Sequence, residues 1–493
     1  MGLMKPLGSI SRSLLWLTIL IIVTTSCLSQ AVQVNSKTLE QSTISPPVAT
    51  VAAKKAVACR APAFPGAEGF GAWTRGGRGG RVIAVTNLNS DGPGSLREAL
   101  TASGPRIVVF HVGGTIELEE RIKITEPYIT IAGQTAPGGG ISIRSKGNTT
   151  DLITVATHDV IVRYLRLRPG PGGDSRAITA SLGDTHDVII DHVSASWGVD
   201  ENITTWYDVH DITIQWSLIG EGLHNSTHSE GAHSKGMLLG SEGSYNISVH
   251  HNLYVHNDER NPRIKTDGLV DFTNNVIYNY GDSAGWITND FGALIVNFVG
   301  NYYKPGPNSV PDLYELDIDR LSDGKLAVFV EGNLGPNRTQ DDQPQDAIVK
   351  ADDHEFLTAK RHKAPTITTT SAQTAYEQVL AGAGATLPER DEVDRRLVAD
   401  VVNGTGAIID HPDQVGGWPI IANGVTPTDE DGDGMPNIWE ENHQLNPRLE
   451  TDGSADADHD GYTNVEEYLN NTNPHDDSDN AWDECTFFPA VQS

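Results

Sequence analysis

Short apolar runs recur along the middle of the chain at a nearly constant interval. Each run is rich in β-branched or other strand-forming residues, and glycine, asparagine or aspartate separates it from the next run. The last five runs start 24, 35, 23 and 24 residues apart, which is a repeat length typical of stacked architectures. The seven runs lie at residues 153–155, 160–162, 188–190, 212–214, 247–249, 270–272 and 294–296.

No helical periodicity is visible between these runs, so the repeats are not strand–helix units. The pattern therefore predicts an all-β fold, a right-handed parallel β-helix over residues 61–371, in which every turn supplies strands joined by bends. The single long interval is explained by an insertion at residues 221–236.

Asparagines recur at matching places just after the strands. Asparagine tolerates left-handed backbone and forms local hydrogen bonds, so a stacked set is expected to form an internal ladder at one bend. The alternative is that they are ordinary turn residues of a β-sandwich. The four positions are Asn252, Asn275, Asn301 and Asn333.

The strand pattern ends near residue 371, and helical spacing follows at residues 372–380 and 391–398. We expect residues 372–425 to form a helical capping segment on the end or side of the solenoid, where strand edges need cover.

The N-terminus has the layout of an exported protein. Two basic residues precede an apolar run at 14–23 that is too short for a comfortable membrane span, which predicts a signal peptide over residues 1–27 and a linker over 28–60. Cys27 stands where a lipoprotein would be cleaved and lipidated; simple cleavage a few residues later is the alternative. We therefore expect a secreted or surface-anchored monomer with no transmembrane segment.

Two cysteines remain in the mature chain, Cys59 and Cys485. They would pair in an oxidising compartment or stay as separate buried thiols, and sequence alone leaves both open. Seven Asn-x-Ser/Thr triplets would be glycosylated only in a eukaryotic secretory host. They begin at Asn148, Asn202, Asn225, Asn246, Asn337, Asn403 and Asn470.

The formal net charge of -30 is concentrated in the C-terminal tail, residues 426–493, which has eighteen acidic residues and one basic residue. The remainder is only mildly acidic, and the segment 260–265 carries two arginines and a lysine within six residues. Such a cluster in an acidic chain indicates an anionic ligand, because a positive cleft focuses the local field. The alternative is a set of structural ion pairs with surface carboxylates.

The tail contains two copies of the pattern Asp-x-Asp-x-Asp-Gly-x5-Glu. A hard Ca²⁺ ion prefers several oxygen ligands, and the glycine allows the sharp turn of such a loop. A solvated acidic linker would not need glycine and glutamate at these places. The predicted ligands are Asp429, Asp431, Asp433, Asn437 and Glu440 in the first loop and Asp456, Asp458, Asp460, Asn464 and Glu467 in the second. The tail resembles dockerin or thrombospondin type 3 repeats, which suggests a structural role.

Four motifs together resemble the polysaccharide lyase family 1 pectate lyases. They lie in order at residues 64–71, 131–139, 194–198 and 260–263, and the likeness extends from about 64 to 340. The resemblance implies a parallel β-helix that cleaves polygalacturonate by calcium-dependent β-elimination.

The resemblance also implies roles for the basic residues. Arg260 matches the arginine that removes the C5 proton of galacturonate, and Lys235 and Lys265 match residues that hold substrate carboxylates. Arg263 lies between them and either binds substrate, faces the core or stacks on a neighbour. An arginine base needs a lowered pKa, which we expect from like-charge repulsion by Lys235, Lys265 and Ca²⁺.

The catalytic calcium of that family is bound by carboxylates on neighbouring turns. The matching positions here are Asp174, Asp200 and Glu201, while a further aspartate of the family would fall near Thr204, where this chain departs from the pattern. Either Glu201 takes its place or the substrate itself holds the ion.

Other functions fit the sequence less well. A pectin lyase acting on methylated chains would need fewer cations, a polygalacturonase would need paired aspartates, and a non-catalytic carbohydrate-binding β-helix would not need Arg260. One short basic patch does not make a nucleic-acid surface. The histidines of the insertion, His224, His228 and His233, lack compact metal-ligand spacing, so zinc is not expected there.

Overall fold

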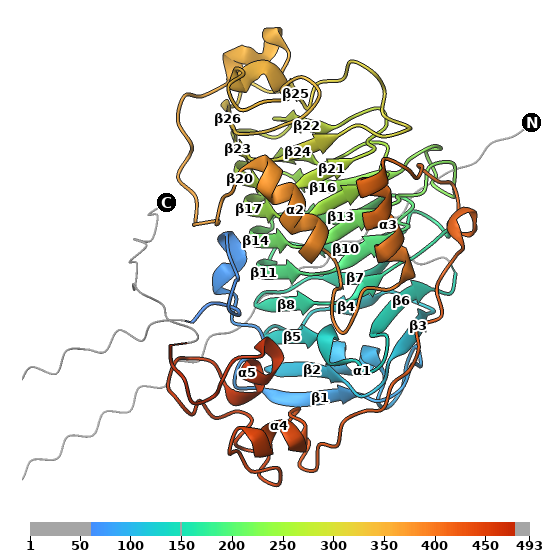
Figure 1. Ribbon diagram of the computed structural model, residues 1–493, viewed down its shortest axis with the longest axis vertical. Helices are drawn as coiled ribbons and strands as arrows, with labels where there is room; N and C mark the ends of the chain where they lie inside the picture. Colours follow the sequence, from blue (N-terminus) through green and yellow to red (C-terminus); the bar gives the residue numbers. More distant parts are fainter. Residues whose placement is uncertain (1–60, 148–149, 479–493) are drawn as a thin grey trace, which may run out of the picture. The chain divides into compact units, whose positions relative to one another are not determined.

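The computed structural model describes residues 61–147 and 150–478. These residues form three parallel sheets in which strands from successive turns lie side by side, as Figure 1 shows, and this confirms the predicted right-handed parallel β-helix. The predictions for residues 1–60, including Cys27 and Cys59, and for Cys485 fall outside the described residues. Among the described residues no helix has the length and apolar character needed to cross a bilayer.

Among the described residues, eight turns contribute one strand to each of the three sheets, and sheet 1 has one further strand at each end. Sheet 1 contains β1 (Arg81–Val85), β2 (Arg106–Phe110), β5 (Ile129–Ala132), β8 (Val160–Arg163), β11 (His186–Asp191), β14 (His210–Gln215), β17 (Tyr245–His250), β20 (Gly268–Thr273), β23 (Leu294–Val299) and β26 (Leu326–Glu331). Sheet 2 contains β4 (Ile122–Ile124), β7 (Asp151–Val155), β10 (Arg176–Ser181), β13 (Glu201–Trp206), β16 (Lys235–Ser241), β19 (Arg263–Thr266), β22 (Gly285–Thr288) and β25 (Leu316–Asp319). Sheet 3 contains β3 (Gly114–Leu118), β6 (Ile141–Ser145), β9 (Arg166–Leu167), β12 (Ser194–Ser196), β15 (Leu218–Gly220), β18 (Leu253–Val255), β21 (Val276–Tyr278) and β24 (Tyr302–Lys304).

All seven apolar runs of the sequence lie in strands, and their inward side chains stack in register from turn to turn. One column of sheet 1 passes through Val162, Ile190, Ile214, Val249 and Phe272, all of which are buried. Because identical positions meet in every turn, β-branched and aromatic side chains pack against their own kind and form one continuous apolar core.

The asparagine ladder is confirmed at the bend between sheets 1 and 3. The side-chain amide of Asn252 donates to Asn275 at 3.0 Å, Asn275 to Asn301 at 3.1 Å, and Asn301 to Asn333 at 2.9 Å. All four residues are buried, and each amide also satisfies backbone groups of its neighbours. The ladder thereby fixes the register between successive turns.

Two helices of the segment predicted to cap the solenoid cover the outer face of sheet 3. Helix α2 (Ala372–Gly382) and helix α3 (Glu392–Asn403) lie beside the stacked strands in Figure 1. Their apolar side chains pack against β15, β18 and β21. Arg396 of α3 donates to both oxygens of Glu221 at 2.7 and 2.8 Å. This pair fastens the start of the insertion to α3.

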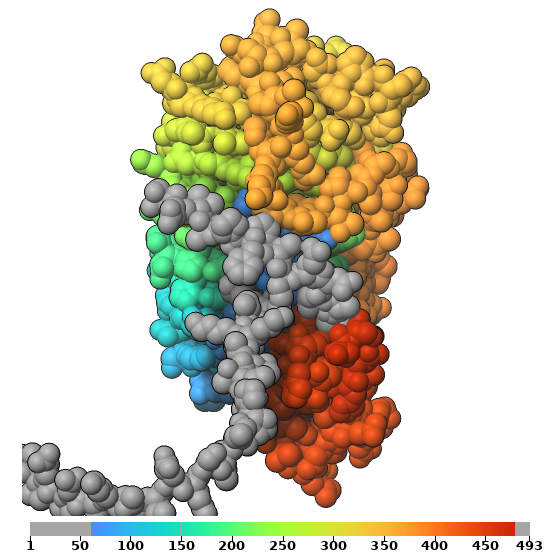
Figure 2. Space-filling view, turned by 90° about the vertical axis from the view of Figure 1, so that its left-hand side faces the viewer, coloured from blue at the N-terminus to red at the C-terminus, as the bar shows by residue number. Residues whose placement is uncertain are grey.

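Three short helices lie at the first turns of the solenoid. They are α1 (Leu96–Thr101), α4 (Asn437–Asn442) and α5 (Asn464–Asn470). Met435 and Val465 of the tail pack with Ile107 and Val109 on the outer face of β2. Figure 2 shows the C-terminal segments, orange to red, running down one side of the stacked turns. The described part of the tail is therefore packed on the β-helix.

Candidate active site

A polar groove of about 490 Å³ lies over the outer face of sheet 2. Strands β7, β10, β13, β16 and β19 form its floor, and the insertion between β15 and β16 forms one wall. Because outward residues on parallel strands stack in register, charged side chains from successive turns meet here. The lining residues used below are Asp151, Asp174, Arg176, Asp200, Glu201, Thr204, Trp206, His228, His233, Arg260 and Lys265.

One column of residues on sheet 2, part of which forms the groove floor, alternates in charge from turn to turn. Arg176 pairs in register with Asp151, Glu201 with Lys235, and Lys235 with Glu259. Arg176 lies 3.5 Å from Asp151 and 3.0 Å from Glu201, so its guanidinium contacts carboxylates of the turn before it and the turn after it. Stacked like charges would repel at this spacing, and alternation removes that cost.

Arg260 lies in the groove wall directly before β19. Its guanidinium donates to Glu201 and lies 3.8 Å from Asp200. Its φ of 59° is left-handed, which is unusual for a long side chain and marks a position that the surrounding structure imposes. Burial lowers the pKa of Arg260, and the charge of Arg176 lowers it further, while Asp200 opposes the shift.

The source of this pKa shift differs from the expected one. We expected Lys235, Lys265 and a calcium ion to repel the charge of Arg260, but burial is the main cause and the neighbouring cation is Arg176. Arg176 was missed because it lies outside the motifs and the basic segment on which the site was predicted. Aligning the turns at 25-residue intervals would have found it.

Lys235 is buried on β16, and its ammonium lies 2.7 Å from Glu259. Within the described residues, those that line the groove do not include Lys235. Its proposed contact with a substrate carboxylate stays a prediction, and it would require Lys235 to leave Glu259.

Arg263 and Lys265 both lie on β19, with their side chains over aromatic rings. The guanidinium of Arg263 lies 3.3 Å from the ring centre of Trp286 and donates to Thr288 at 3.0 Å. The ammonium of Lys265 lies 4.9 Å from the ring centre of Trp206. Burial lowers the pKa of Lys265 and lowers that of Arg263 to about 10. The side chain of Arg263 therefore stacks on a neighbouring ring, which is one of the positions predicted for it.

The three predicted calcium ligands of the groove lie near one another but are held by different partners. Asp174 accepts from the backbone and hydroxyl of Ser229, both at 2.9 Å. Glu201 accepts from Arg176, Arg260 and, at 3.1 Å, the hydroxyl of Thr204. Asp200 accepts from Arg176.

As the described residues are placed, these three carboxylates do not fit an all-oxygen calcium cage. The guanidinium of Arg176 stands among the carboxylates where an ion would stand, and Glu201 is committed to two arginines. The groove calcium stays a prediction, and no catalytic step is assigned to it below.

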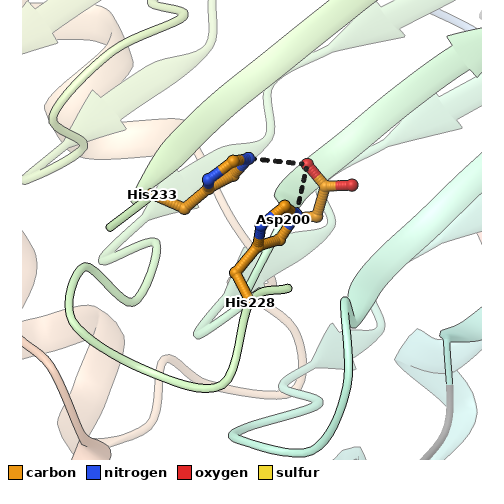
Figure 3. Close-up of side chains that lie close together, drawn as sticks. All are labelled: Asp200, His228 and His233. Atoms are coloured by element: carbon orange, nitrogen blue, oxygen red, sulfur yellow. Dashed lines mark ion pairs between the residues drawn. The ribbon is translucent and has the colours of Figure 1, made fainter. Parts of the chain in front are cut away.

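Asp200 instead belongs to a compact group with two histidines of the insertion. Figure 3 shows the rings of His228 and His233 side by side, both directed at Asp200. Sequence spacing gave no reason to expect this, because Asp200 is on another turn and the loop fold brings the rings to a centre-to-centre distance of 3.4 Å. Burial would raise the pKa of Asp200, but its neighbours His233, Arg176 and Arg260 outweigh burial and lower that pKa.

The tail loops fold as compact carboxylate clusters. Ligand atoms of Asp431, Asp433, Glu440 and Asp452 lie within 4.8 Å of one another, and those of Asp456, Asp458 and Asp460 form a second cluster. Several buried oxygens of these loops have no hydrogen-bond partner, which is the expected state of a cation site without its ion. They are Asp431 Oδ2, Asp433 Oδ2, both Glu440 Oε atoms, Asp452 Oδ1, Asp458 Oδ2 and Asn464 Oδ1.

Asp452 is a ligand candidate that the sequence pattern missed. It lies beyond the twelve residues of the first loop and reaches back to it from the link between the loops. Burial raises the pKa of Asp433 to about 8 and that of Glu440 to about 7, and their carboxylate neighbours add to both shifts. The residues present thus fit a hard divalent cation that would relieve this repulsion.

The chain combines a parallel β-helix with a groove of arginine, lysine and carboxylate side chains on one sheet. These features define a class of protein suited to binding an extended, charged polymer. A sequence model described as pectate lyase matches residues 49–300 of the chain. Probable pectate lyase C of Aspergillus flavus is 39% identical over 386 residues, which cover 77% of this chain and 86% of that protein. Probable pectate lyase C of Aspergillus oryzae matches with the same identity and coverage.

Among solved structures, a pectate lyase from Bacillus sp. N165 in complex with trigalacturonate has a TM-score of 0.45 and 16% identity, covering 64% of this chain and 98% of that one. The chain belongs to the pectate lyase family, and it is an enzyme of the polysaccharide lyase class.

Proposed function

We propose that the protein is a secreted pectate lyase that cleaves de-esterified polygalacturonate by β-elimination and releases 4,5-unsaturated oligogalacturonates. The observation that carries this proposal is Arg260, a groove arginine whose pKa burial lowers, next to the groove cation Lys265. The predicted signal peptide supports export, with lipid attachment at Cys27 as the finer alternative.

In the proposed reaction, the guanidine of Arg260 accepts the proton from C5 of a galacturonate unit. The electron pair of that C–H bond forms the C4=C5 double bond, and the C4–O bond to the preceding sugar breaks. The departing oxygen takes a proton from water. The C5 proton is acidic because the adjacent carboxylate accepts the developing charge, and in this proposal Lys265, which lines the same groove, holds a substrate carboxylate.

The role of Glu201 in this scheme is to position the base. Its carboxylate holds the Arg260 guanidinium, and it is itself held by Arg176 at 3.0 Å and Thr204 at 3.1 Å. This pair favours charged Arg260, so the burial of Arg260 and the charge of Arg176, which both lower its pKa, have to outweigh the pair before the neutral base forms.

We propose calcium as a cofactor of the tail, where the two loops act as dockerin- or thrombospondin-like structural repeats. Their ligands are Asp429, Asp431, Asp433, Asn437 and Glu440, and Asp456, Asp458, Asp460, Asn464 and Glu467, with Asp452 added to the first loop. An ion there would fasten α4 and α5 onto β2.

A pectin lyase acting on methylated chains is less well supported, because Arg263 and Lys265 place two cations on the same strand, β19, and Lys265 lines the groove. A non-catalytic carbohydrate-binding protein would not require the strained Arg260.

The test is a comparison of polygalacturonate with highly methylated pectin as substrates. Elimination is followed by ultraviolet absorbance of the unsaturated product, and total cleavage by new reducing ends. The proposal predicts equal yields of both signals and a clear preference for polygalacturonate. Reducing ends without absorbance would mean hydrolysis, and a preference for methylated pectin would support the pectin lyase alternative.

A further inference from the structure

We propose that Asp200, His228 and His233 form a binding site for one borderline divalent cation, of the Zn²⁺ or Co²⁺ type, at the insertion side of the groove. This site goes beyond the proposed lyase function and is separate from the oxygen-ligand sites of the tail. The site would use two imidazole nitrogens and one carboxylate oxygen, whereas a calcium site would use oxygen atoms alone.

The spacing of the ligand atoms is the first argument. Nε2 of His233 lies 3.5 Å and Nε2 of His228 lies 3.8 Å from the same oxygen, Asp200 Oδ1. Hydrogen-bonded atoms of these types approach to about 2.7–3.2 Å. Two ligands that bind one ion at about 2.0–2.2 Å lie roughly 3.3 Å apart in a tetrahedral site. The observed spacing is closer to the second geometry than to the first.

Burial is the second argument. The side chains of Asp200, His228 and His233 are 10%, 5% and 7% exposed, so water solvates them poorly. The two imidazole rings face each other at 3.4 Å beside the carboxylate of Asp200. One shared cation would satisfy the carboxylate oxygen that the rings surround.

The hydrogen bonds of the histidines define what binding requires. Nδ1 of His233 lies 3.2 Å from the carbonyl oxygen of Ala232, so it donates there and leaves Nε2 as a lone pair directed at Asp200. This is the arrangement that orients metal-binding imidazoles. Nδ1 of His228 accepts from the backbone of Glu230 at 3.1 Å, so its proton is on Nε2. Binding at His228 therefore breaks that hydrogen bond and moves or releases one proton.

The donor set selects the kind of cation. Imidazole suits zinc, cobalt, nickel and copper, whereas calcium prefers oxygen. Asp174 lies 3.8 Å from His228 on the outer side and offers a further oxygen. Three protein ligands leave a coordination position open toward the groove, where water or a substrate oxygen would bind.

The test is titration of the full-length protein, with its tail saturated with Ca²⁺, using Co²⁺ as a visible probe. The proposal predicts one equivalent of Co²⁺ with the intense absorption bands of a low-coordinate, nitrogen-containing site. His228→Gln and His233→Gln should each weaken binding by about 10²-fold, since loss of even an outer partner costs 10–100-fold. His224→Gln is the matched control, because His224 is in the same insertion but faces Asp258 at 3.7 Å, and its binding should equal that of the wild type.

Circular dichroism of each variant shows whether it is folded, and X-ray absorption of the Co²⁺-loaded wild type counts imidazole ligands without any substitution. Absence of Co²⁺ binding, a spectrum without imidazole, or equal displacement by Ca²⁺ would overturn the proposal. None of these readouts depends on lyase activity, so failure here leaves the proposed function untouched.

Discussion

The guanidinium of Arg176 lies against the carboxylate of Glu201, with Nε 3.0 Å from Oε2. The same guanidinium contacts Asp200 and lies 3.5 Å from Asp151, so one cation serves three buried carboxylates from the two turns on either side of it. Glu201 in turn holds Arg260. The position of the proposed base thus depends on an arginine that has no assigned chemical role.

Arg176→Gln should reduce the free energy of unfolding by about 2–4 kcal/mol, because it leaves buried carboxylates without their counter-charge. Urea unfolding at saturating Ca²⁺ measures the loss. The control is Arg395→Gln on α3, whose side chain is 54% exposed and which should change stability by less than about 0.5 kcal/mol. Equal stability of the two variants would contradict the counter-charge role.

Lys265→Ala should raise KM for polygalacturonate about 10-fold or more while the protein stays folded, since a charge-assisted contact contributes about 1.5–3 kcal/mol. The kinetics of elimination at several salt concentrations measure the effect, and the salt dependence of KM should weaken. Lys360→Ala, at an exposed lysine, is the control. Unchanged KM with reduced kcat would assign Lys265 to the transition state instead.

Calcium should raise the thermal midpoint of the wild type. At a free Ca²⁺ concentration of 100 times Kd, binding stabilises the folded protein by about 2.7 kcal/mol. Glu440→Gln should remove much of that gain, because Glu440 is buried in the first loop cluster. Glu441→Gln is the adjacent exposed control and should keep the gain. Calorimetry with Ca²⁺ and with chelator makes the comparison, and an equal response of both variants would exclude the loop as a calcium site.

Acid should destabilise the protein through His251. Burial lowers the pKa of His251 to about 4, while the unfolded chain keeps a value near 6.5. Between these values the unfolded state binds a proton that the folded state does not, so stability falls as pH falls from about 6.5 to 4, by about 3 kcal/mol in total.

His251→Asn should flatten this part of the stability profile, and asparagine accepts the left-handed backbone, φ 55°, at that position. The neighbouring His250, whose pKa is also lowered by burial, would keep part of the slope. Chemical unfolding at a series of pH values measures it, with His411→Asn, 45% exposed at its side chain, as the control. A profile identical to that of the wild type would place the titration elsewhere.

The repeat signal in the sequence predicted the strands and the asparagine ladder because each turn of a solenoid is a local unit with its own pattern. Arg260 and Lys265 were found for the same reason, since one short segment carries both. Contacts between turns were not visible. Arg176 meets Glu201 across a 25-residue step, and His228 and His233 meet Asp200 only through the path of the insertion.

Charge balance also escaped sequence reasoning. Lys235 was expected to hold a substrate carboxylate, which stays a prediction, and the sequence did not show that it also pairs with Glu259 on the next turn at 2.7 Å. In the tail, the twelve-residue pattern contains its own ligands, so Asp452, which joins from outside, carried no signal. In each case the contact depends on which residues the fold brings together, and the local sequence does not show this.

The central claim is that Arg260 removes the C5 proton. The measurement is the initial rate of ultraviolet absorbance with polygalacturonate for the wild type and for Arg260→Lys at equal concentrations of folded protein. General-base catalysis contributes about 10²–10⁴-fold, so the variant should lose kcat/KM by that factor while its thermal midpoint stays close to that of the wild type. A variant that keeps its rate within about tenfold would show that another group takes the proton.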